Sequence, residues 1–206
     1  MATPVGNIAP FINDVFTITS HWWYERIDPI TGELKIHKGL DISTGLSKPL
    51  YSMLNGRVLS KFTDSAGALT LIIVDDNVGS NTYGYATYYT HMASYEFGIE
   101  VGTRVVIGQK VGMEGTTGHS TGIHLHLEMQ DVSRFNWQWH YSYTKSDYLD
   151  PTVFMGIDNI DDTQWIYDDT QWIYDGTPVP PTPSDKKKGK FPWVIYAKKI
   201  RNKPYF

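Results

Sequence analysis

One stretch decides the fold of this chain: Gly115-Thr116-Thr117-Gly118-His119-Ser120-Thr121-Gly122-Ile123-His124-Leu125-His126-Leu127-Glu128-Met129. Beyond the glycine-spaced turn, apolar side chains at 123, 125, 127 and 129 alternate with polar ones at 124, 126 and 128. A period of two is typical of a β-strand whose faces differ, so both imidazoles should lie on one face and the other face should pack on a core. Two imidazoles on a stiff strand suit a transition metal. A tetrahedral zinc site, however, needs about three protein ligands and keeps one position for water.

Composition limits where the other ligands can come from. The chain has 206 residues, enough for one domain with a full core plus an appendage, and its 41% hydrophobic content is that of a globular protein. It contains no cysteine. This excludes disulfide scaffolds, thiolate zinc sites and cysteine nucleophiles, so a metal would have to be held by histidines and carboxylates.

Most of the remaining chain reads as short strands. Residues 50–62, 69–75 and 83–92 are rich in Val, Ile, Tyr and Thr, and turn sequences punctuate them at 55–56, 66–67 and 77–79. We predict antiparallel strands joined by tight turns, with shorter β segments at 105–107 and 110–111. No amphipathic run of 12 or more residues indicates a helix. The predicted class is all-β, mainly antiparallel, with few or no long helices, in a single compact domain with a C-terminal extension.

Two further segments carry candidate ligands. In Ile36-His37-Lys38-Gly39-Leu40-Asp41-Ile42, the even offset between His37 and Asp41 puts both on one side of an extended chain, and Gly39 lets the backbone approach whatever they hold. His91 follows the aromatic strand end Tyr88-Tyr89-Thr90. Each feature alone is weak evidence for a site.

Taken together, these segments resemble the lysostaphin-like zinc endopeptidase family, whose members cut peptidoglycan peptides. The blocks around His37 and Asp41, around His91, and from Gly115 to His126 occur in the order of the family, with glycines at 102, 108 and 112 between them. The resemblance covers roughly residues 20–151.

The resemblance implies a Zn²⁺ cofactor with His37, Asp41 and His126 as its ligands. His91 and His124 would stay off the metal beside the bound water. Imidazoles near neutral pKa suit proton transfer and stabilisation of a developing oxyanion. We therefore expect His91 and His124 to share these roles, with the division between them left open.

Other polar positions allow two interpretations each. Glu128 lies on the strand face of the histidines and either orients an imidazole or is a solvated carboxylate. Arg26 either contacts substrate or pairs with an acidic neighbour. We place His119 as a solvent-facing loop residue and leave His21 and His140 out of the metal site.

Aromatic residues flank the candidate site. Tyr88 and Tyr89 adjoin His91, and Trp137 and Trp139 follow the metal strand, so they form either the wall of a substrate groove or core packing. Residues 22–24 and 132–148 are our candidates for the groove walls.

We divide the chain into an endopeptidase domain, residues 1–156, and an extension, residues 157–206. The extension holds a tandem Asp-Asp-Thr-Gln-Trp-Ile-Tyr repeat, a proline-rich spacer and a basic aromatic tail, with eight Lys/Arg against one Asp in residues 185–206. The repeat is either a small wall-binding element or a polar surface loop. The basic tail has two interpretations. It binds anionic wall polymers or another protein by electrostatic attraction, or it is simply solvated.

The predicted function is hydrolysis of peptide stems or cross-bridges of bacterial peptidoglycan. Residues 1–7 lack a signal-peptide pattern and no stretch approaches the ~20 apolar residues of a membrane span. We expect an enzyme that acts on the cell wall, carried in a bacteriophage tail or released on host lysis, with other tail proteins as partners through the extension and no nucleic-acid partner. The alternatives are a catalytically inactive wall-binding or virion structural protein, and an assembly module in residues 161–206.

Overall fold

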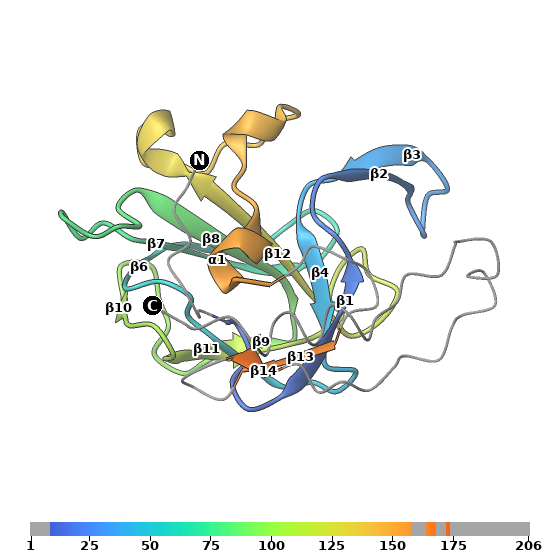
Figure 1. Ribbon diagram of the computed structural model, residues 1–206, viewed down its shortest axis with the longest axis horizontal. Helices are drawn as coiled ribbons and strands as arrows, with labels where there is room; N and C mark the ends of the chain where they lie inside the picture. Colours follow the sequence, from blue (N-terminus) through green and yellow to red (C-terminus); the bar gives the residue numbers. More distant parts are fainter. Residues whose placement is uncertain (1–8, 158–163, 168–171, 174–206) are drawn as a thin grey trace, which may run out of the picture.

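A computed structural model describes residues 9–157, 164–167 and 172–173. Its main element is a nine-stranded sheet in which every neighbouring pair is antiparallel (Figure 1). In order across the sheet the strands are β10 (Arg104–Val105), β6 (Gly56–Thr63), β7 (Leu69–Val74), β8 (Tyr85–Met92), β12 (Leu125–Asp131), β4 (Leu40–Ser43), β1 (Val15–Ser20), β13 (Gln164–Tyr167) and β14 (Trp172–Ile173).

Two smaller sheets complete the fold. A three-stranded sheet contains β5 (Pro49–Tyr51), β11 (Lys110–Met113) and β9 (Ser94–Tyr95). The hairpin of β2 (Tyr24–Ile27) and β3 (Leu34–His37) projects from the body as a separate arm (Figure 1). We call it the β2–β3 arm.

Helical structure is minor in the described residues. It comprises the 3₁₀ turns η1 (Val132–Phe135) and η2 (Lys145–Asp147) and the five-residue helix α1 (Pro151–Met155). Helix α1 begins where Asp150 accepts a hydrogen bond from the Thr152 amide and where proline occupies the first turn. The predicted all-β class, with mainly antiparallel strands and few helices, is confirmed.

The predicted meander is present as β6, β7 and β8, which pair in sequence order. The prediction was wrong in one respect, because residues 50–62 do not form one strand. Their first residues belong to β5 in the small sheet, and the chain turns before β6 begins at Gly56. The β segment predicted at 105–107 is likewise only the two-residue β10.

The alternation along β12 positions the site. Leu125, Leu127 and Met129 are buried in the main core, which lies against one face of the large sheet. The polar residues between them point to the opposite face. Because β12 lies between β8 and β4, the register brings His126 opposite Thr90 on one side and Asp41 on the other.

Part of the tandem repeat extends the sheet. Strand β13 pairs with β1, and β14 pairs with β13. Those parts of the repeat are strand rather than loop. The proline-rich spacer and the basic tail lie outside the described residues. In the part of the chain that the structure describes, no helix is long and apolar enough to cross a membrane.

Candidate metal centre and active site

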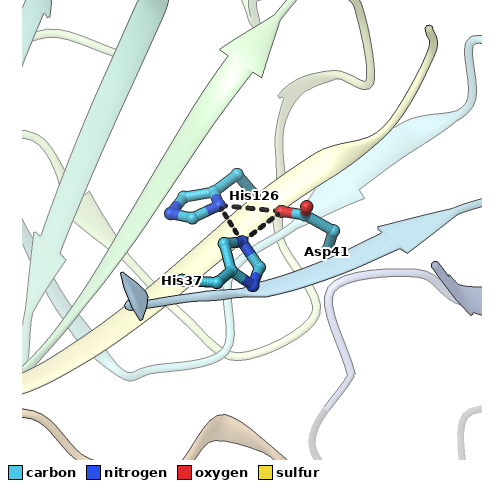
Figure 2. A group of neighbouring side chains, drawn as sticks. All are labelled: His37, Asp41 and His126. Carbon is cyan, nitrogen blue, oxygen red and sulfur yellow. Dashed lines mark hydrogen bonds and ion pairs between the residues drawn. The ribbon is translucent and has the colours of Figure 1, made fainter. Parts of the chain in front are cut away.

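Three potential ligand atoms converge on one point (Figure 2). His37 Nε2 lies 3.1 Å from Asp41 Oδ1 and 3.1 Å from His126 Nδ1, and these last two atoms are 2.7 Å apart. The residues come from the end of β3, from β4 and from β12. A triangle of this size can close around a single ion with ligand distances of about 2.0–2.2 Å.

The backbone between His37 and Asp41 leaves room for the ring of His126. A Cβ atom added at Gly39 would lie 2.5 Å from both Cε1 and Nε2 of His126. Any side chain at position 39 would therefore collide with the imidazole. Glycine is required here because the ring of one donor packs directly on the backbone between the other two.

Hydrogen bonds on the outer side fix the tautomers of both imidazoles. His37 Nδ1 donates to the backbone carbonyl of His21 over 2.9 Å. His126 Nε2 donates to Glu128 Oε1 over 3.0 Å. Once the proton on the inner nitrogen of His126 is displaced, each ring presents an unprotonated nitrogen to the shared point, as metal ligation requires.

Contacts on the outer side also orient the carboxylate of Asp41. Arg26 places one guanidinium nitrogen 3.3 Å from Asp41 Oδ2 and donates with another to Ser20 Oγ over 2.9 Å. Ser20 pairs with Asp41 in the β1–β4 register. Asp41 Oδ2 is thus paired with the guanidinium of Arg26, which leaves Oδ1 to face the imidazoles.

The local field favours a cation at the shared point. Burial raises the pKa of Asp41, but hydrogen bonds from His126 and His37 outweigh this effect and hold the pKa well below its usual range. Burial lowers the pKa of His126, yet its bonds to Asp41 and Glu128 raise it to about 10. Burial, only partly offset by Asp41, lowers the pKa of His37. The ionised carboxylate of Asp41 therefore concentrates negative charge beside the donors.

The residues present fit zinc. Two imidazole nitrogens and one carboxylate oxygen, with no thiolate, form a donor set of the catalytic zinc type, which keeps a fourth position for water or substrate. The tautomers set by His21 and Glu128 are those that this donor set needs. A hard cation such as calcium would instead be expected among six to eight oxygens.

Two more histidines stand beside the three donors. The ring centroids of His91 and His124 are 4.7 Å apart, and His124 Nε2 lies 3.8 Å from Asp41 Oδ1. His91 Nδ1 donates to the Thr117 carbonyl over 2.7 Å, and His124 Nδ1 donates to the Gly122 carbonyl over 2.9 Å. In each ring Nδ1 is thereby occupied, which leaves Nε2 as the atom that can exchange a proton. Burial, and then the positive charge of His126, lower the pKa of His91 to about 4, which keeps this ring neutral near pH 7.

The donors open into a small cleft of about 70 Å³. Its walls come from the turn of the β2–β3 arm and from the glycine-spaced loop before β12. These walls meet where His119 Nε2 lies 3.1 Å from Asp28 Oδ1. The prediction for His119 was right about exposure but missed this contact.

The structure decides between interpretations that the sequence left open. Glu128 is 7% exposed and orients an imidazole instead of being solvated. Arg26 pairs with an acidic neighbour, Asp41. His21 contributes its backbone carbonyl to the site, a role that sequence reasoning missed. His140 stacks on Phe135 and is not part of the donor cluster.

The aromatic residues predicted to flank the site all make packing contacts. Tyr89 is fully buried and belongs to the main core. Tyr88 stacks on Trp139, and Trp137 makes an edge contact with Tyr83. These rings attach the segment after β12 to the sheet face that carries His126.

Comparison with known proteins gives a consistent assignment. The model of peptidase family M23 matches residues 35–139. Peptidoglycan DD-endopeptidase ShyB of Vibrio cholerae is 33% identical over 54% of this chain and 24% of that protein. Lysostaphin of Staphylococcus staphylolyticus is 29% identical over 58% of this chain and 22% of that protein.

A solved structure agrees. A zinc containing peptidase from Vibrio cholerae has a TM-score of 0.50 and 26% identity, covering 73% of this chain and 41% of that chain. The present chain spans a third or less of the length of the first curated relatives that it matches. The family match covers half of this chain and includes the three converging donors and both neighbouring histidines. The chain belongs to peptidase family M23, the lysostaphin-like zinc metallopeptidases.

Proposed function

We propose that this chain is a zinc-dependent endopeptidase that hydrolyses peptide stems or cross-bridges of bacterial peptidoglycan. In this proposal His37, Asp41 and His126 bind the zinc, and His91 and His124 act beside it. The convergence of the three donor atoms carries the proposal. The likeness to a peptidoglycan DD-endopeptidase and to lysostaphin supports the substrate class.

The chemistry divides between the metal and the chain. When bound, zinc supplies a Lewis acid that acidifies water and polarises a peptide carbonyl. His91 is neutral near pH 7 with Nε2 free, so it can accept a proton at that atom. His124 Nε2, 3.8 Å from Asp41 Oδ1, lies near enough to the donors to stabilise negative charge on the substrate oxygen or to deliver a proton to the leaving nitrogen.

Release of muropeptides from purified walls tests the proposal. The zinc-loaded protein should release soluble peptides, whereas the same protein stripped with a chelator should release none until zinc is restored. Mass spectrometry of the products identifies the bond that is cut. Release that continues at full rate after complete zinc removal would refute the metal mechanism. Wall binding without any turnover by the zinc-loaded protein would show an inactive wall-binding protein.

We also propose the division into an endopeptidase domain, residues 1–156, and an extension, residues 157–206, that docks the enzyme. The basic charge of residues 185–206 supports a docking role. A role in a phage tail, for entry or host lysis, remains a prediction from the sequence. Deletion of residues 174–206, which leaves β13 and β14 in the sheet, should leave peptide cleavage intact and abolish incorporation into a particle.

A further inference from the structure

A buried lysine adjoins one of the three donors. Lys38 directly follows His37, and its whole residue is only 7% exposed. Its Nζ atom is buried and has no hydrogen-bond partner among the described residues. Burying an ammonium without a hydrogen-bonded partner is costly, so this arrangement calls for a physical explanation.

Three tyrosine rings surround the ammonium. Lys38 Nζ lies 3.4 Å from the ring centroid of Tyr141, 3.9 Å from that of Tyr143 and 5.9 Å from that of Tyr148. Cation–π contacts of this kind attract the ammonium to the ring faces. They stabilise the charge in part, but they leave its three N–H groups without acceptors.

The lysine lines a cavity of about 510 Å³ on the side of the β2–β3 arm that faces Tyr141 and Tyr143. The two tyrosines are mostly exposed, at 65% and 83%. Because water already surrounds most of each ring, the rings can swing aside without disturbing the core. Lys38 would then present its ammonium to the cavity. The remaining lining residues are Glu25, Glu33, Leu34, Lys35 and Ile36.

Among the described charged groups of the cavity, Lys38 is the cation without a partner. Lys35 is already paired, with Nζ 2.6 Å from Asp28 Oδ2. Glu128, behind Lys38, is engaged by His126. Glu25 and Glu33 are exposed, so water and salt screen their charge. They would repel a highly charged anion but would weaken the binding of a single carboxylate only slightly.

We propose that Lys38 and this cavity form a subsite for a carboxylate of the substrate peptide. The subsite lies behind the metal centre, because Lys38 follows His37 and lies in the field of Glu128, whose Oε1 accepts from His126 Nε2. Its cavity shares no lining residue with the cleft at the donors, so a peptide whose scissile bond lies at the donors would pass the end of β3 to place a free carboxylate there. On binding, the carboxylate accepts the N–H groups of Lys38 and the tyrosine rings open outward. This inference rests on the proposed endopeptidase function.

A pair of synthetic stem peptides tests the subsite. The two differ only in bearing a free carboxylate or its carboxamide at one position, and kcat/KM is measured for both with the zinc-loaded full chain. The wild type should prefer the carboxylate peptide by about tenfold or more, as expected for a charge-assisted hydrogen bond. Lys38→Met should bring the ratio close to one, and Lys38→Arg should keep most of the preference.

Lys35→Met is the matched control, because it removes a lysine of the same cavity whose charge is already paired. It should keep the wild-type ratio. If Lys38 only anchors the tyrosines, Lys38→Met will lower both rates equally and leave the ratio unchanged, which would overturn the subsite.

The comparison in the wild type needs no variant and separates two failures. A wild-type protein that cuts both peptides equally well would contradict the carboxylate subsite alone. A zinc-loaded wild-type protein that cuts neither peptide and releases nothing from walls would contradict the proposed function itself.

Discussion

At the residue scale, the site depends on how closely the ring of His126 packs on the backbone between His37 and Asp41. Gly39 is the point of contact, since a Cβ there would lie 2.5 Å from two ring atoms. The rest of the site follows from outer hydrogen bonds that leave one lone pair on each imidazole directed inward. Small changes at these positions should therefore alter metal binding before they alter the fold.

Gly39→Ala should weaken zinc binding at least tenfold, because His126 must shift away from the other donors. Competition with a chromophoric chelator measures the dissociation constant. Gly122→Ala is the control, because its added Cβ would meet no atom within 4 Å and its φ is not positive. Equal zinc affinity in the two variants would contradict the role given to Gly39.

Glu128→Ala should lower zinc affinity by about 10–100-fold, the usual effect of removing the outer partner of a ligating histidine. Glu128→Gln keeps an acceptor oxygen for His126 Nε2 but loses the charge, so its affinity should fall between those of the wild type and Glu128→Ala. The same chelator competition checks this order. Wild-type affinity in Glu128→Ala would show that the bond does not orient the ring.

The sequence predicts part of this site for definite reasons. Alternation along residues 123–129 is enough to place His126 and Glu128 on one face. It says nothing about the carbonyl of His21 or the hydroxyl of Ser20, because those contacts depend on which strands pair. The contact between His119 and Asp28 likewise joins two loops that the sequence cannot bring together.

At the element scale, the connection between β7 and β8 is built around Asp75, which is fully buried. Its Oδ1 accepts from the Asn77 amide over 2.9 Å, and its Oδ2 accepts from the hydroxyls of Ser80 and Thr82 over 2.5 Å each. Burial raises the pKa of Asp75, but these hydrogen bonds outweigh it and lower the pKa below its ordinary value. The carboxylate therefore stabilises the fold in its ionised form.

Asp75→Asn should lower the free energy of unfolding by about 1–3 kcal/mol at pH 7, from the loss of charge-assisted hydrogen bonds. Because the folded pKa lies below the unfolded value of about 3.9, the stabilisation is complete above that pH and is lost as pH falls through the folded pKa. The difference between wild type and variant should therefore shrink below about pH 4.

Urea unfolding of both proteins at pH 7 and at pH 3 measures this difference. Glu33→Gln, at an exposed position, should differ little from the wild type at either pH. A difference between wild type and Asp75→Asn that is unchanged or larger at pH 3 would contradict the role of the ionised carboxylate.

The elements themselves were predictable where the turn chemistry is local. The β6–β7–β8 meander follows from β-rich segments separated by glycine turns. The division of residues 50–62 between two sheets was not predictable, because β5 pairs with the distant β11. A pairing partner far along the chain leaves no local signal.

At the scale of the whole molecule, the three donors join the β2–β3 arm to two strands of the large sheet. A ligand that binds only the folded state stabilises it by about 4 kcal/mol when present at about a thousand times its dissociation constant. Zinc should therefore raise the Tm of the wild-type protein by several degrees.

His37→Ala should lose this zinc-dependent rise in Tm, whereas His140→Ala should keep it, because His140 is outside the donor cluster. Differential scanning calorimetry with and without zinc provides the comparison. An equal rise in Tm for both variants would place the zinc elsewhere.

The fold class was predictable from composition and period-two patterning, but the full extent of the sheet was not. Each copy of the repeat in residues 161–174 is too short to indicate a structural unit by itself. Its strands become part of the fold only through pairing with β1. Local propensity suggests a strand, whereas its place in a sheet depends on the partner.

The most direct measurement is the zinc content of the purified protein after exhaustive dialysis, determined by mass spectrometry for the wild type and four single variants. We predict one zinc per chain for the wild type and for His140→Ala, and essentially none for His37→Ala, Asp41→Ala and His126→Ala. Full zinc retention in any of these last three would contradict the three-residue metal centre.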